Sequence, residues 1–205
     1  MKKTSIVLAT LLALSGFAFA AGNAASSATP WVDKGNLLVN VGLGWGGLSA
    51  GAEYDFARID VAKVVPITFG GAARALIDPG VFDTTYSTFE IGLGAFVTAH
   101  VGFKELSLSS GLGWVSHFDL YLGLGLGFAS GSLASAYSGT GFGLLPGVGI
   151  STFEGVSYYF NDRIALNLEY GYIGRIGYSE NYGVLGTYSY YWPLYYSTIG
   201  VILKL

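Results

Sequence analysis

The sequence predicts an all-β fold in which eight antiparallel strands close, up-and-down, into a transmembrane barrel. The first observation is the segment 118–128, whose even positions are all Leu or Phe, while its odd positions carry Asp119, Tyr121 and three glycines. A period of two is that of a β-strand with two different faces. Since glycine cannot provide a wet exterior, the Leu and Phe face is assigned to lipid and the glycine face to the barrel interior.

Composition supplies the second observation. The chain of 205 residues is 52% hydrophobic and only 11% charged, whereas an ordinary soluble domain is about 25% charged. Beyond residue 20, Gly, Ser and Thr interrupt every apolar run before it reaches the roughly 20 residues that a membrane helix needs. A chain too apolar for water and without a spanning helix is expected to cross the membrane as a barrel. Cysteine is absent, which excludes disulfides and thiolate metal sites.

Residues 1–20 are predicted to be a signal peptide. They combine a positive end at Lys2 and Lys3 with an apolar core and a small-x-small cleavage site at 18–20. The two lysines are among only 10 basic residues, against 13 acidic ones, so their removal makes the chain more acidic than its formal net charge of −3. Nucleic acid is therefore not an expected partner.

After a short N-terminal lead at 21–36, the barrel domain is expected to occupy residues 37–205. A tight turn is predicted at Gly46 and Gly47, where the apolar parity flips, with a bulge as the alternative. The alternation blurs near Glu154, where a bulge would keep the carboxylate out of lipid. The eight predicted strands are 37–46, 48–58, 65–77, 89–103, 118–128, 146–160, 164–174 and 191–205.

Connection lengths predict the orientation. The short 161–163 turn is expected on the periplasmic side, and the loops 78–85, 129–145 and 175–190 on the extracellular side. The 129–145 loop could also lengthen the following strand at its outer end. Residues 104–117 are interpreted as a long periplasmic connection, because a ninth strand would put the two chain termini on opposite sides of the membrane. Apolar residues alternate within this segment, so an additional hairpin arm is the alternative interpretation.

Polar residues on the inward parity are the candidate functional residues. Arg74 is expected to pair with Glu90, and Lys204 with Asp119, because each pair lies at a similar height. A buried charge is tolerated only when it is paired or hydrated. The interior is therefore expected to be a salt-bridged plug, or alternatively a polar path or a small ligand site. The lumen-lining polar residues are Glu53, Asp55, Arg74, Glu90, His100, Asp119, Glu169 and Lys204.

Aromatic residues near strand ends are predicted to form interfacial girdles, with ordinary core aromatics as the alternative. The girdle residues are Trp45, Trp114, Trp192 and Tyr195.

Several features taken together resemble the small outer-membrane β-barrels of bacteria, in the broad group of the A-, X- and W-type barrels and the opacity proteins. They are the signal peptide, the eight alternating strands, the 161–163 turn before the strand at 164–172, and the terminal alternation. The resemblance implies the outer membrane, contact with its lipid, and insertion by the barrel assembly machinery. One departure is Leu205, since this group usually ends in an aromatic residue.

The resemblance leaves three functions open. We expect a non-enzymatic structural or surface-exposed protein, whose extracellular loops could meet a ligand or a host surface. Resemblance to the W-type barrels implies the alternative of a narrow channel for small or apolar solutes. The third function is that of an enzyme, because some barrels of this size modify lipid A. Its candidate catalytic residues would be His100 or His117 with a serine and an acid.

Eight strands leave an interior just wide enough for side chains or one small ligand. Inward glycines could leave a slender cavity there unless rings such as Phe96 and Tyr121 fill it. These lumen glycines are Gly92, Gly94, Gly123, Gly125 and Gly127.

Motifs that suggest chemistry are weak. The segments 42–47 and 47–51 match G-x-G-x-x-G and G-x-S-x-G, but both motifs need a helix after the turn, and here a strand follows. No group of His, Asp and Glu has metal-ligand spacing along the sequence, so neither a metal nor a cofactor is expected.

Overall fold

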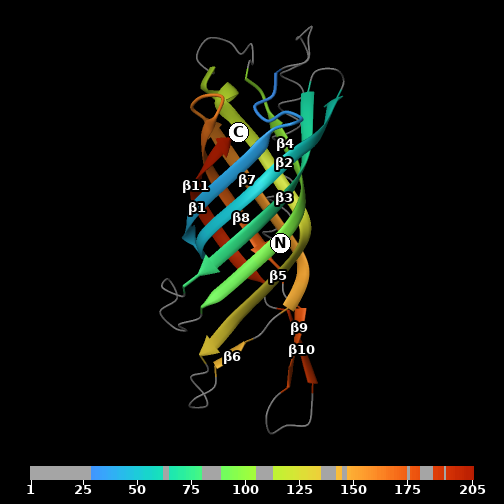
Figure 1. Ribbon diagram of the computed structural model, residues 1–205, viewed down its shortest axis with the longest axis vertical. Coiled ribbons are helices and arrows are strands. Elements are labelled where there is room, and N and C mark those ends of the chain that lie inside the picture. Colours follow the sequence, from blue (N-terminus) through green and yellow to red (C-terminus); the bar gives the residue numbers. More distant parts are fainter. Residues whose placement is uncertain are drawn as a thin grey trace, which may run out of the picture.

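Eight long strands form the barrel in the computed structural model (Figure 1). The structure describes residues 29–61, 65–79, 89–104, 113–134, 142–144, 147–174, 176–180, 187–191 and 193–205. Consecutive long strands pair antiparallel, and the first pairs with the last, so the sheet closes as predicted. The strands are β1 (Leu37–Trp45), β2 (Gly47–Val61), β3 (Val65–Asp78), β4 (Glu90–Gly102), β5 (Phe118–Ala134), β7 (Gly147–Tyr159), β8 (Ile164–Ile173) and β11 (Leu194–Lys204).

The outside of the barrel is apolar. Leu124 and Leu126, from the segment that predicted the lipid face, are 57% and 62% exposed. Large apolar side chains continue this surface around the sheet, as expected for strands that face lipid. They include Val41, Leu43, Leu93, Val97, Ile150, Leu168, Ile199 and Val201. Within the described part of the chain, no helix has the length and apolar character needed to cross a membrane.

Three short strands lie beyond one end of the barrel, opposite the C-terminus (Figure 1). β6 (Phe142–Leu144) pairs with the end of β5, and β9 (Ile176–Glu180) forms a hairpin with β10 (Thr187–Tyr191). We call this the hairpin end and the other the C-terminal end.

These extensions correct the predicted loops. Of the predicted 129–145 loop, residues 129–134 belong to β5, and residues 142–144 form β6, which lies just before β7 in the chain. The 175–190 segment contains β9 and most of β10, and the final strand starts at Leu194 instead of residue 191. Beyond the barrel wall neither face of a strand needs to be apolar, so the alternation that marked the other strands is missing there.

The turns are as predicted, but the bulge is not. Gly46 and Gly47 both have φ of 89° and form the tight β1–β2 turn. In the 161–163 turn, the amides of Arg163 and Ile164 donate to Asn161 Oδ1 at 2.9 and 3.0 Å. β7 runs in unbroken register through Glu154, which is exposed on the outer face. A one-residue bulge there would move the following side chains of β7 to the opposite faces of the sheet.

The bulge lies instead in β2, where the register against β3 shifts between Asp55 and Ala57. Other predictions fall wholly or partly on residues outside the described ranges: the signal peptide, residues 21–28 of the lead, most of the 78–85 loop, Trp192, and the central part of the 104–117 connection. The described end of that connection is a 3₁₀ helix, η1 (Gly113–His117).

The described residues of the N-terminal lead, 29–36, close the C-terminal end of the barrel. Trp31 and Val32 are 6% and 1% exposed, and the Trp31 ring stacks on Tyr159 with centroids 4.8 Å apart. Lys204 Nζ donates to the Trp31 carbonyl at 2.8 Å, and Thr68 Oγ1 donates to the Val32 carbonyl at 2.7 Å. The lead is therefore a plug built into the strand ends.

Candidate functional site

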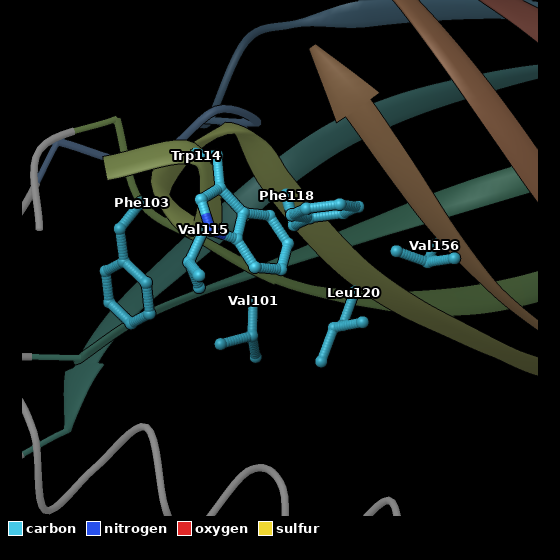
Figure 2. Close-up of a pocket in the computed structure, with 7 residues that line it drawn as sticks. All are labelled: Val101, Phe103, Trp114, Val115, Phe118, Leu120 and Val156. Atoms are coloured by element: carbon cyan, nitrogen blue, oxygen red, sulfur yellow. The ribbon is translucent and has the colours of Figure 1, made fainter. Parts of the chain in front are cut away.

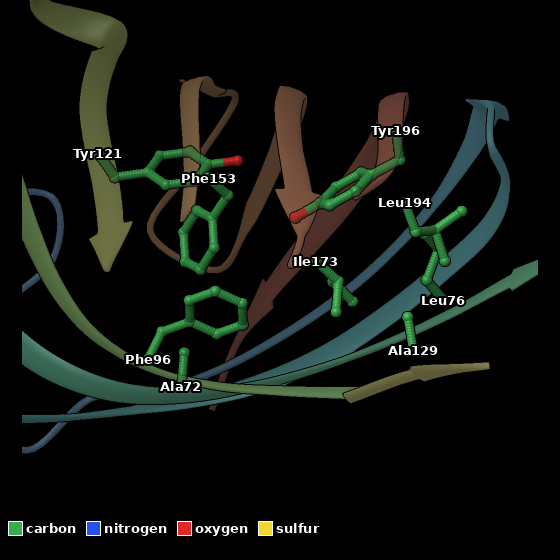
Figure 3. Packing of buried hydrophobic residues seen from close by; sticks show 9 residues of the cluster. All are labelled: Ala72, Leu76, Phe96, Tyr121, Ala129, Phe153, Ile173, Leu194 and Tyr196. Carbon is green, nitrogen blue, oxygen red and sulfur yellow. The ribbon is translucent and has the colours of Figure 1, made fainter. Parts of the chain in front are cut away.

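Side chains fill the interior in three tiers. From the hairpin end to the middle of the barrel, six strands contribute apolar groups to one cluster (Figure 3). At its centre, the rings of Phe96 and Phe153 meet edge to face with centroids 4.8 Å apart. The whole cluster is Ala72, Leu76, Phe96, Tyr121, Ala129, Phe153, Ile173, Leu194 and Tyr196.

The lumen glycines make room for these side chains. A Cβ atom on Gly94 would lie 2.4 Å from the Phe96 ring, and one on Gly123 would lie 2.4 Å from the Phe153 ring. Real carbon atoms do not approach so closely. The other three predicted glycines behave alike: Gly92 and Gly127 accommodate Ile173, and Gly125 allows β4 to pass close by. Volume removed by the glycines is therefore occupied by neighbouring groups.

The middle tier is a charged network around Arg74. Its guanidinium lies 3.4 Å from Glu53 Oε2 and 3.5 Å from Glu169 Oε1. Glu169 also accepts hydrogen bonds from Tyr121 and Tyr196, at 3.1 and 3.0 Å. All five side chains are buried. The Arg74 guanidinium is thus shared by two carboxylates, and that of Glu169 accepts two further hydrogen bonds from tyrosines.

The third tier lies between this network and the lead. His100 Nδ1 is 2.7 Å from Asp119 Oδ2, and His100 Nε2 is 2.9 Å from Glu53 Oε1. The Thr98 hydroxyl donates to the same Glu53 oxygen. Asp55 is fully buried beside these groups, yet neither of its oxygens has a hydrogen-bond partner.

A very small void lies among these tiers. It measures about 10 Å³ and is lined by groups that include Glu53, Arg74, His100 and Tyr121. A cavity needs about 10–15 Å³ to hold one water molecule. This void therefore has space for at most one water molecule.

Both predicted ion pairs are wrong. The β3–β4 register sets Arg74 opposite Gly94, while Glu90 lies opposite Asp78, four residues further along. Arg74 therefore meets carboxylates from β2 and β8. Lys204 and Asp119 do share the C-terminal end, but Lys204 bonds to the lead and Asp119 to His100.

The predicted girdle residues lie at both ends of the outer surface. Trp45 and Tyr195 are 68% and 44% exposed near the hairpin end, and Trp114 is 56% exposed at the C-terminal end. Beside η1, apolar side chains form a groove of about 240 Å³ on the outside of the barrel (Figure 2). It offers apolar contact, as an acyl chain would need, and its lining includes Val101, Phe103, Trp114, Val115, Phe118, Leu120 and Val156.

The motifs weighed for catalysis serve packing. Both ring nitrogens of His100 face carboxylates, and His117 Nδ1 lies 2.8 Å from the Tyr159 carbonyl oxygen. Ser49, the serine of the G-x-S-x-G match, lies on β2 and donates to Thr198 Oγ1 at 3.4 Å. A nucleophile activated by histidine needs a direct hydrogen bond between the two, and these contacts do not supply one.

Sequence reasoning missed two features of the interior. The first is the plugging lead, for which the only signal was Trp31 in an otherwise small and polar segment. The second is the convergence of Glu53, Asp55 and His100, whose ligand atoms lie within 4.8 Å of one another. Spacing along the chain could not show it, because β3 separates β2 from β4 and the register decides which residues meet.

Comparison with known proteins returns structural similarity alone. No protein-family model matches the sequence, and neither does any curated protein. The chain is similar to the neisserial surface protein NspA, with 17% identity over 83% of this chain and 94% of that one, and a TM-score of 0.40. It is also similar to the outer membrane protein OprG from Pseudomonas aeruginosa, with 13% identity, coverage of 88% and 98%, and a TM-score of 0.41. Values this low carry no functional argument, which rests on the geometry above.

Proposed function

We propose that this chain is a non-enzymatic structural protein of the bacterial outer membrane, with a non-conducting barrel that holds extensions above the cell surface. The observation that carries the proposal is the filled interior. Rings occupy the hairpin end, an ion network the middle, and the lead the C-terminal end. A general solute would find no room between them.

The orientation follows from the same geometry. In outer-membrane barrels the periplasmic turns are short and the longer loops face outward. Three of the four connections at the hairpin end are long, while the tight 46–47 turn there and the long 104–117 connection at the other end are exceptions. The hairpin end, with β6, β9 and β10, is then extracellular, and the lead is periplasmic. The apolar outer face would contact lipid, the barrel assembly machinery would insert the chain, and a ligand or host surface would meet the β9–β10 hairpin.

Conductance tests the proposal directly. The full chain, refolded and reconstituted in planar bilayers, is expected to give no discrete current steps above the lipid baseline, while a general porin inserted in the same way gives them. Steps that scale with the amount of folded protein would contradict a sealed barrel and favour the narrow channel.

Surface exposure needs a separate experiment. Protease added to intact cells is expected to cut within the 175–190 extension and to leave a membrane-embedded fragment. Cleavage only after the outer membrane is permeabilised would place the hairpin end on the periplasmic side and contradict the orientation.

A further inference from the structure

We propose that the interior of the barrel binds a divalent transition-metal ion, Zn²⁺ by its ligand chemistry, between Glu53, Asp55 and His100. One ligand atom from each residue lies within 4.8 Å of the other two, and all three residues are buried. The site goes beyond the structural role proposed above, since a barrel can be sealed without any metal.

The strands converge on this point for a structural reason. Glu53 and Asp55 are successive inward residues of β2, just before its bulge, and Asp55 lies opposite Gly70 of β3. A Cβ atom on Gly70 would lie 2.7 Å from Asp55 Oδ1 and 3.0 Å from Glu53 Oε1. The missing side chain lets both carboxylates lean across β3 towards His100 on β4. Any other residue at position 70 would push them apart.

Asp55 is the observation that points to a ligand. Its exposure is 0%, and neither carboxylate oxygen has a hydrogen-bond partner in the described structure. Buried polar groups are almost always paired, and a buried carboxylate without a partner is costly. A cation between Asp55 and its neighbours would supply the missing partner.

The charge of the tier favours a divalent ion. Three carboxylates, Glu53, Asp55 and Asp119, surround a single imidazole, while Arg74 is shared between Glu53 and Glu169. Even a protonated His100 would leave the group negative. Buried charges are stable only when they are compensated, and a 2+ ion bound to neutral imidazole brings the cluster closer to neutrality.

The orientation of His100 is that of a metal ligand. Its Nδ1 lies 2.7 Å from Asp119 Oδ2, while its Nε2 points to Glu53 Oε1 at 2.9 Å. Histidines that bind metal commonly donate their other ring N–H to a carboxylate in this way. Binding through Nε2 would require this nitrogen to be free of a proton, and any proton there would leave to solvent as the metal–nitrogen bond forms. Asp119 is then a positioning residue, not a ligand.

Ligand type narrows the choice of metal. Zn²⁺ is bound by His nitrogen and by Asp or Glu oxygen, whereas Ca²⁺ and Mg²⁺ take oxygen ligands. One imidazole with two carboxylates therefore suits Zn²⁺ better than either alkaline-earth ion. The lead covers this tier through the hydrogen bond from Thr68, which lies opposite His100, to Val32. We thus expect the ion to enter during folding and to exchange slowly afterwards.

The experiment measures metal content after refolding. The full chain is refolded into detergent micelles with Zn²⁺, cleared of loosely bound metal with a chelator, and analysed by elemental mass spectrometry. About one Zn²⁺ per chain is expected, as for a closed site. Asp55→Asn and His100→Gln should lose the metal, and Asp119→Asn should weaken the affinity about 10–100-fold. Asp60→Asn, the same change at an exposed position on β2, should retain it.

The outcomes separate this site from its alternatives. Equal retention by Asp55→Asn and Asp60→Asn would mean adventitious surface binding and would overturn the proposal. A metal-free wild type whose folded fraction is unaffected by Zn²⁺ would also overturn it, and would mean that Asp55 is held protonated. Heat-modifiable migration on SDS gels checks that each variant is folded. Conductance stays independent of these results, so the sealed barrel and the metal site can fail separately.

Discussion

Substitution of Gly123 by alanine tests whether the glycine face borders an empty channel or a filled core. In the structure, the added Cβ atom would lie 2.4 Å from both Cε1 and Cζ of Phe153. Carbon atoms in contact are about 3.5–4.0 Å apart, so the ring would have to move by about 1 Å. An empty channel would instead accept a methyl group without any movement.

The ring has nowhere to move. Phe153 is 2% exposed, its edge meets Phe96, and the Arg74 guanidinium lies 4.5 Å from its centroid. Extra methyl groups in a well-packed core cost about 1–3 kcal/mol. We therefore expect Gly123→Ala to lower the free energy of unfolding by that amount.

Gly71→Ala is the matched control, because Gly71 is also a strand glycine but faces outward. The nearest atom to its added Cβ would be Phe56 Cε1, at an ordinary 3.8 Å. Glycine within a strand is about 0.5–1 kcal/mol less favourable than alanine, so this variant should gain stability. Urea unfolding of the chain in lipid vesicles, followed by tryptophan fluorescence, measures both. If Gly123→Ala were as stable as Gly71→Ala, the interior would not be filled as described.

Three further changes test the charged tier, the plug and an exposed ion pair. Arg74→Met leaves two buried carboxylates without their cation and should lower the free energy of unfolding by about 3–5 kcal/mol. Adding Glu169→Gln should restore part of this loss in urea unfolding. Strictly additive losses would argue against the network. Trp31→Ala should lower the free energy of unfolding by about 3 kcal/mol, because it removes a buried indole, whereas Trp31→Phe should lower it much less. Equal losses in the two variants would show that the ring does not seal the barrel. The hydrogen bond from Lys104 lowers the pKa of Asp162, so this carboxylate stabilises the fold above its unfolded pKa and loses that effect as the pH falls through its folded pKa. Asp162→Asn should flatten the acid side of the stability profile, and an unchanged profile would contradict the contact.

Strand positions could be predicted because alternation is a local property. A strand that touches lipid on one face must place a large apolar side chain at every second position, as Leu122, Leu124 and Leu126 do. The same parity requires Arg74 and His100 to face inward without knowledge of any neighbour. Where no lipid is met, as in β9 and β10, this constraint disappears and the strands were predicted as loop.

Contacts across the interior could not be predicted, because they depend on register and on shear around the whole barrel. Arg74 and Glu90 lie on adjacent strands at similar distances from one loop, yet Arg74 meets Glu169 from β8, 95 residues away. Likewise, the bulge after Asp55 sets where that carboxylate lies relative to His100. Neither the contact between Arg74 and Glu169 nor the position of Asp55 relative to His100 can be inferred from the alternation of the sequence.

The two closures of the barrel are independent, and this bears on function. Rings at the hairpin end come from the barrel wall itself, with Phe96 and Phe153 locked against each other, whereas Trp31 belongs to a segment that precedes the first strand. Undocking the lead would expose the His100 tier to solvent at the C-terminal end but would leave the rings in place. A continuous path would need both closures to open at once, through rearrangements on different elements. Access from one side alone is what a buried metal site requires, and it is also compatible with a barrel that does not conduct.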